Sequence, residues 1–127
     1  MNSVIPQNLI VECRRKLVTK KAEVLNRIRA IQLEFTQSQL SRSTSGDEID
    51  QTVAQQEEHS FLISQDRMRS QLIEIEMALA RIEDGKFGIC EETEEKIETE
   101  RLLAIPWTRL SIEGAELREA MQKRYAK

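Results

Sequence analysis

Two stretches of the chain place mainly apolar residues at alternating steps of four and three, which is the spacing of a coiled-coil seam. The seam positions are Leu17, Lys21, Val24, Ile28, Ile31 and Phe35 in the first stretch, and Phe61, Gln65, Met68, Leu72, Ile75, Leu79 and Ile82 in the second. When the stretches are paired in antiparallel order, the residue numbers of each of the six pairs, such as Phe35 with Phe61, add up to 96. A constant sum is what an antiparallel hairpin requires, and half of it places the turn at residue 48. The pattern therefore predicts a mainly α-helical fold built on a long antiparallel hairpin, whose arm projects roughly 45 Å.

Composition favours a fold without a large globular core. Only 4% of the 127 residues are aromatic and 32% are charged, so the apolar residues suffice for a narrow helical stripe and little more. The two cysteines, Cys13 and Cys90, make no recognisable disulfide framework. No apolar run approaches the ~20 residues of a membrane span, and the N-terminus lacks the apolar stretch of a signal peptide. We therefore expect a cytoplasmic protein with no membrane partner.

Charge is distributed unevenly along the chain, although the net charge is only −3. Residues 1–46 hold eight Lys/Arg and three Asp/Glu, whereas residues 47–100 hold five and sixteen. A basic outgoing helix beside an acidic returning helix favours the hairpin, although each exposed ion pair contributes only ~0–1 kcal/mol. Because the basic side chains would face the acidic helix and aromatic residues do not alternate with them, we expect no direct binding to DNA.

Turn and cap residues mark the ends of the expected segments. The hairpin turn falls in Gly46–Asp50, which carries three carboxylates, and Gly85 is placed to end the second helix in the C′ position. Ser111 is placed to cap a last helix over residues 112–126. The expected buried face of that helix consists of Leu117, Met121 and Tyr125.

These marks divide the chain into two expected domains. Residues 1–84 form an N-terminal segment and a coiled-coil hairpin with an acidic tip near 46–52. Residues 85–127 form a small finger-like module and the C-terminal helix.

The segment that begins at the end of the hairpin carries a family resemblance. Residues 78–90 read ALARIEDGKFGIC, and Ile97 followed by Arg101–Pro106 gives I-x(3)-R-L-x-A-x-P. The pair Asp47-x-x-Asp50 ends 40 residues before Cys90. Together these features resemble the DksA/TraR family. The resemblance implies a protein that binds bacterial RNA polymerase, inserts its hairpin through the secondary channel and alters initiation at selected promoters. The hairpin register favours a monomer, although a seam interrupted by Lys21 and Gln65 leaves pairing between two chains open.

The finger departs from the C-x2-C-x17-C-x2-C ligand pattern of that family. The four ligand positions are occupied here by Cys90, Thr93, Ser111 and Gly114. A structural zinc site needs four nitrogen or sulfur ligands at about 2.0–2.3 Å, and only one thiolate remains. We therefore expect a degenerate finger that holds no zinc and uses no other cofactor.

Packing would then have to replace the metal. We expect Trp107 to fill the vacated region, beside a small apolar core of Phe87, Ile89, Ile97, Leu102, Leu103 and Leu110. Cys90 would be a small buried hydrophobic residue, with its pKa raised by the acidic residues around it.

Two further sets of positions are carried over from the family. Asp47 and Asp50 match the D-x-x-D-x-A tip that meets polymerase near its catalytic centre, but Thr52 stands in place of the alanine. The alternative reading is that Asp47 caps the turn and Asp50 the second helix. Arg67 and Arg69, on the returning helix, are candidate contacts to the polymerase rim, or else part of a solvated face.

The alarmone ppGpp binds family members with basic residues at three positions. Those positions are occupied here by Glu74, Ile105 and Ala115. Replacing three cations by one anion and two neutral groups removes most of the attraction for a polyanion. We therefore expect weak or no synergy with ppGpp.

Two other functions remain open from the sequence. The acidic tip also suits a Gre-like factor that acts on backtracked polymerase, although the chain lacks the second globular domain of such factors. The seam alone also suits a coiled-coil scaffold with no polymerase role. An enzyme is not expected, because there is no nucleophile–base pair and no Gly-rich phosphate loop.

Overall fold

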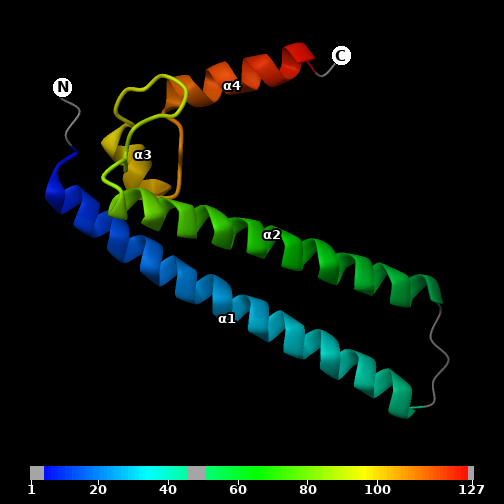
Figure 1. The fold of residues 1–127 in the computed structure, drawn as a ribbon. Coiled ribbons are helices and arrows are strands. Elements are labelled where there is room, and N and C mark those ends of the chain that lie inside the picture. Colours follow the sequence, from blue (N-terminus) through cyan, green and yellow to red (C-terminus); the bar gives the residue numbers. More distant parts are fainter. Residues whose placement is uncertain (1–4, 46–50, 126–127) are drawn as a thin grey trace. The chain divides into compact units, whose positions relative to one another are not determined.

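The computed structural model describes residues 5–45 and 51–125, with side chains described outside 43–45 (Figure 1). Four helices account for most of them: α1 (Gln7–Ser45), α2 (Gln51–Glu83), α3 (Thr99–Ala104) and α4 (Ile112–Tyr125). The only β pairing within the described ranges is an isolated antiparallel bridge between Ile89 and Lys96. The predicted mainly α-helical fold with a long antiparallel α1/α2 pair is confirmed. None of the described helices is apolar over a long enough stretch to cross a bilayer.

Contacts group the chain into two units, to which α1 and α2 both contribute. The hairpin unit is Lys21–Ile73, and the finger unit is Met1–Lys20 together with Glu74–Lys127. The expected boundary at residue 84 stays a prediction.

The hairpin unit follows the register predicted from the seam. The rings of Phe35 and Phe61 stack with centroids 4.1 Å apart and planes 10° from parallel, which confirms their predicted pairing. The side-chain amide of Gln65 donates to the carbonyl of Ile28 at 3.4 Å. Arg42 and Glu57 form an ion pair between the same two helices. The seam residues of this unit are buried or half-buried, so α1 and α2 bury the stripe that the periodicity indicates.

The finger unit has a compact apolar core supplied by several elements. Leu17, Ile75 and Leu102 are fully buried, one each from α1, α2 and α3. The Cys13 thiol donates to the Leu102 carbonyl at 3.6 Å, and Lys16 Nζ donates to the Leu103 carbonyl at 2.9 Å. These contacts fix α3 against the first turns of α1. Each fully buried leucine or isoleucine contributes ~1.5–3 kcal/mol.

The end of α2 has the glycine cap that the sequence predicts. Gly85 has φ +72°, its N–H donates to the Ile82 carbonyl at 3.2 Å, and the next N–H, of Lys86, donates to the Arg81 carbonyl at 2.9 Å. These two bonds are those of a Schellman motif with Gly85 at C′. The motif turns the chain from α2 into the finger.

The last helix is capped as predicted, but its expected buried face is wrong. Ser111 Oγ accepts the Gly114 N–H at 3.0 Å, which is an N-cap bond. The expected core residues Leu117, Met121 and Tyr125 are instead 47%, 48% and 76% exposed. The helix packs on the finger through its first turns, where Gly114 is buried and Ala115 and Arg118 are half-buried. That contact selects a different stripe of the helix surface.

Candidate functional site

The four degenerate zinc positions lie together in the finger unit. The Cys90 side chain is 1% exposed, and its sulfur accepts the Thr93 N–H at 3.4 Å. A Cβ atom built on Gly114 would lie 2.4 Å from Cys90 Sγ and 3.3 Å from Ser111 Oγ. The 90–93 turn and the start of α4 therefore meet directly at the sulfur.

These residues do not fit a structural zinc ion. Thr93 and Ser111 offer only hydroxyl groups, and Gly114 offers no side chain. The close approach of Cys90 Sγ to Gly114 leaves no room for a ligand at the fourth position. Over residues 5–45 and 51–125, no group of three or more His, Cys, Asp or Glu side chains is placed to hold a metal ion.

The pKa of Cys90 is shifted in the direction opposite to the one expected from the sequence. Burial alone would raise the pKa of this thiol, but hydrogen bonds from the side chains and backbone of Ser111 and Thr93 favour the thiolate and lower the pKa to about 6. The predicted increase is therefore wrong. Donors from the degenerate ligand positions surround the sulfur, and their effect exceeds that of burial.

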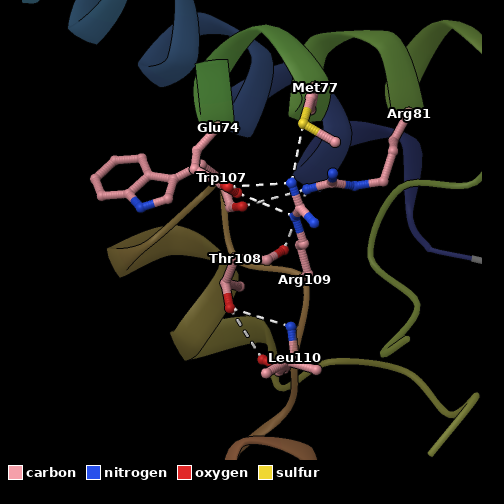
Figure 2. A network of polar contacts seen from close by, with 7 residues as sticks. All are labelled: Glu74, Met77, Arg81, Trp107, Thr108, Arg109 and Leu110. Carbon is pink, nitrogen blue, oxygen red and sulfur yellow. Dashed lines mark hydrogen bonds and ion pairs between the residues drawn. The ribbon is translucent and has the colours of Figure 1, made fainter. Parts of the chain in front are cut away.

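A network of arginines holds the loop that joins α3 to α4 (Figure 2). Arg81 on α2 donates to the carbonyls of Trp107 and Thr108 at 3.2 and 3.4 Å. Arg109 makes two bonds of 3.0 Å to the Glu74 carboxylate. Sequence reasoning missed this network. The sequence does show Arg81 near the end of α2 and Arg109 in the 105–111 loop, but their positions alone do not identify their partners.

Trp107 does not fill the region around Cys90. The atoms nearest to the Gly114 position belong to Cys90, Glu92 and Ser111. Trp107 is half-buried, and Figure 2 shows its indole pointing away from Arg109. The vacated region is closed by the direct approach of backbone to sulfur, so no large side chain is needed there.

The three positions compared above with the basic positions of the family, Glu74, Ile105 and Ala115, lie in the finger unit. Glu74 is bonded to Arg109, and Ala115 N–H donates to the Ser111 carbonyl within α4. Ile105 and Glu74 help line a hollow of about 370 Å³, whose other lining residues are Arg101, Trp107, Thr108, Arg109, Leu110 and Arg118. Two of its three arginines are paired with carboxylates, Arg109 with Glu74 and Arg118 with Glu92.

The tip residues are only partly within the described structure. Asp47 and Asp50 lie outside the described residues, whereas Thr52 lies exposed on the first turn of α2. Arg67 and Arg69 are exposed on α2 within the hairpin unit. Arg69 lines a groove of about 240 Å³ with Gln32, Phe61, Leu62, Gln65 and Asp66.

Comparison with known proteins decides the family. The model for the prokaryotic dksA/traR C4-type zinc finger matches residues 85–120. A protein of Caulobacter vibrioides named RNA polymerase-binding transcription factor DksA is 34% identical over 112 residues, covering 87% of this chain and 75% of the relative. The chain belongs to the DksA/TraR family.

Further similarities agree with membership of the DksA/TraR family. An uncharacterized protein of Aquifex aeolicus is 35% identical over 113 residues, covering 87% of this chain and 76% of the relative. The structure of transcription factor DksA2 from Pseudomonas aeruginosa superposes with a TM-score of 0.72 at 28% identity, covering 94% of this chain and 88% of that one. DksA factors are transcription factors and not enzymes, as expected for this chain.

Proposed function

We propose that this chain is a bacterial RNA polymerase-binding transcription factor of the DksA type. In this proposal it acts in the cytoplasm as a monomer, inserts the hairpin into the secondary channel of polymerase and modulates initiation without contacting DNA. The observation that carries the proposal is the 34% identity to a named RNA polymerase-binding factor, which extends over 87% of the chain. The stacked Phe35–Phe61 pair supports it further, because this contact holds the two helices in one register toward the tip.

The tip is the part that we assign to the polymerase interior. Asp47 and Asp50 supply carboxylates there, and Thr52 replaces the family's alanine. Carboxylates at the end of a helical hairpin can pair with basic side chains or perturb the environment of a bound Mg²⁺ ion. Arg67 and Arg69, exposed on α2, would contact the rim of the channel.

The factor would act without zinc and with weak or no ppGpp synergy. The first point is supported by the donor set around Cys90, which contains one sulfur and two hydroxyl groups. The second is supported by Glu74, whose carboxylate lies where the family has a cation and is bonded to Arg109. A polyphosphate at this position would meet a paired arginine and an anion.

An initiation assay with purified polymerase tests the proposal. Wild-type protein is compared with Asp50→Asn and with Asp66→Asn, which makes the same charge change at an exposed position on α2. We expect wild type and Asp66→Asn to change transcript yield from a ribosomal RNA promoter equally, with or without ppGpp, and Asp50→Asn to lose the effect. A larger effect of the protein on transcript yield in the presence of ppGpp would refute only the proposed lack of ppGpp synergy.

Two outcomes would point to the alternative functions. Stimulated transcript cleavage in stalled complexes would indicate a Gre-like factor. Absence of any binding to core polymerase would leave a coiled-coil scaffold.

A further inference from the structure

The two halves of the finger meet at a sulfur atom. In a C4 finger, one metal ion joins a first pair of ligands to a second pair about 20 residues further along. Here the first pair is Cys90 and Thr93, and the second is Ser111 and Gly114. Residue Cys90 is almost fully buried, at 1% exposure, and its sulfur lies against both the Thr93 N–H and the Gly114 backbone.

The glycine at position 114 is explained by this contact. Glycine in a helix costs ~1 kcal/mol relative to alanine, so helix propensity does not favour it in the first turn of α4. A Cβ atom there would lie 2.4 Å from Cys90 Sγ and 3.3 Å from Glu92 Cβ, closer to the sulfur than packed atoms come. Only a residue without a side chain allows α4 to approach the sulfur so closely.

Other bonds join the same two halves around the sulfur. The Glu91 N–H donates to the Arg109 carbonyl at 2.9 Å. The Arg118 guanidinium bonds the Glu92 carboxylate at 2.9 and 3.1 Å. The first bond connects the turn after Cys90 to the segment that leads into α4. The second connects the same turn to the second turn of α4. Within each half, Cys90 N–H donates to the Glu95 carbonyl at 2.8 Å, and Ser111 caps α4.

We propose that the Cys90 sulfur, which packs directly against Gly114 and accepts the Thr93 N–H, replaces the zinc ion as the centre that joins the two halves of the finger. The cross-links Glu91–Arg109 and Glu92–Arg118 supply the rest of the connection. The finger is thus a closed, metal-independent module, and its stability depends on a contact that a four-cysteine finger cannot make. This inference does not depend on polymerase binding.

A double-mutant cycle between Gly114 and Cys90 tests the contact. Gly114→Ala alone places a methyl group on the sulfur and should raise the unfolding equilibrium constant by roughly tenfold or more. In a Cys90→Ala background the sulfur is absent, so the same Gly114→Ala change should have little effect or stabilise by up to about fivefold through helix propensity. Glu116→Ala, an exposed change on α4, is the control and should not depend on the residue at position 90.

Three measurements complete the test. Unfolding of wild type in urea should have the same midpoint before and after treatment with a chelator, and the purified protein should contain no stoichiometric zinc. One zinc per chain, or a midpoint lowered by the chelator, would overturn the proposal. Equal effects of Gly114→Ala in the two backgrounds would also overturn it. If Gly114→Ala alone does not fold, folding of the double variant supports the proposal, and its failure where Cys90→Ala folds refutes it.

Discussion

The stacked phenylalanine pair gives the sharpest test of the hairpin. Phe61→Ala removes a half-buried ring that stacks on Phe35 at 4.1 Å. An aromatic side chain has ~150–250 Å² of surface. Burial of about half of it, roughly 100 Å², at ~25 cal/mol per Å² contributes about 2.5 kcal/mol. The stacking geometry adds about 0.5–1.5 kcal/mol beyond burial. We therefore expect Phe61→Ala to lower the free energy of unfolding by about 3–4 kcal/mol.

The assay is urea unfolding followed by far-ultraviolet circular dichroism, which reports mainly on the long helices. Trp107, the single tryptophan, provides a second signal from the finger unit. Leu62→Ala is the matched control, because this neighbour is 56% exposed and its truncation should change stability by no more than about 0.5 kcal/mol.

The double-mutant cycle with Phe35→Ala isolates the pair itself. We expect a coupling free energy of about 0.5–1.5 kcal/mol, since each single variant already removes the stacking. Additive effects of the two truncations would refute the register in which residue numbers of paired seam positions add up to 96. Loss of polymerase binding in Phe61→Ala, but not in Leu62→Ala, would further indicate that this register positions the tip.

Three other predictions concern the finger. The pKa of Cys90 is lowered to about 6 in the folded state, so its thiolate contributes stability that is complete above the ordinary thiol pKa and is lost as pH falls toward 6. Between pH 6 and 8 the free energy of unfolding should therefore rise with pH in wild type and rise less in Cys90→Ala. Equal slopes in the two proteins would contradict a Cys90 thiolate in the folded state. Ser111→Ala removes the N-cap bond of α4 and should cost about 0.5–2 kcal/mol in urea unfolding, with no change expected for the exposed Glu116→Ala. Arg81→Met keeps the aliphatic stem but leaves the carbonyls of Trp107 and Thr108 without this donor. It should lower the free energy of unfolding by about 1–3 kcal/mol and shift the Trp107 fluorescence. An unchanged urea midpoint and fluorescence spectrum would show that the arginine does not hold the loop.

Much of the hairpin could be predicted from the sequence, because helical periodicity and caps are local. The pairing of Phe35 with Phe61 follows from spacing alone, and the Schellman end at Gly85 follows from the need for a positive φ at C′. Local rules also place Ser111 at the N-cap of α4.

The interior of the finger could not be predicted in the same way. Its geometry depends on groups about 20 residues apart, and the donors that lower the pKa of Cys90 are identified only once Thr93 and Ser111 lie beside it. The face of α4 shows a similar limit. Its apolar stripe at Leu117 and Met121 indicated a core, but the helix packs through Gly114 and Arg118 instead. Periodicity reveals that a helix has an apolar stripe, and packing decides which stripe is covered.

Site-specific cross-linking tests the central claim most directly. A photoreactive amino acid replaces Thr52, which is exposed on the first turn of α2, and in a second sample replaces Tyr125 on the exposed end of α4. After irradiation with core RNA polymerase, the account predicts that position 52 cross-links to residues lining the secondary channel and that position 125 does not. Cross-links from position 52 only to the outer surface of polymerase, or none at saturating protein, would contradict insertion of the hairpin.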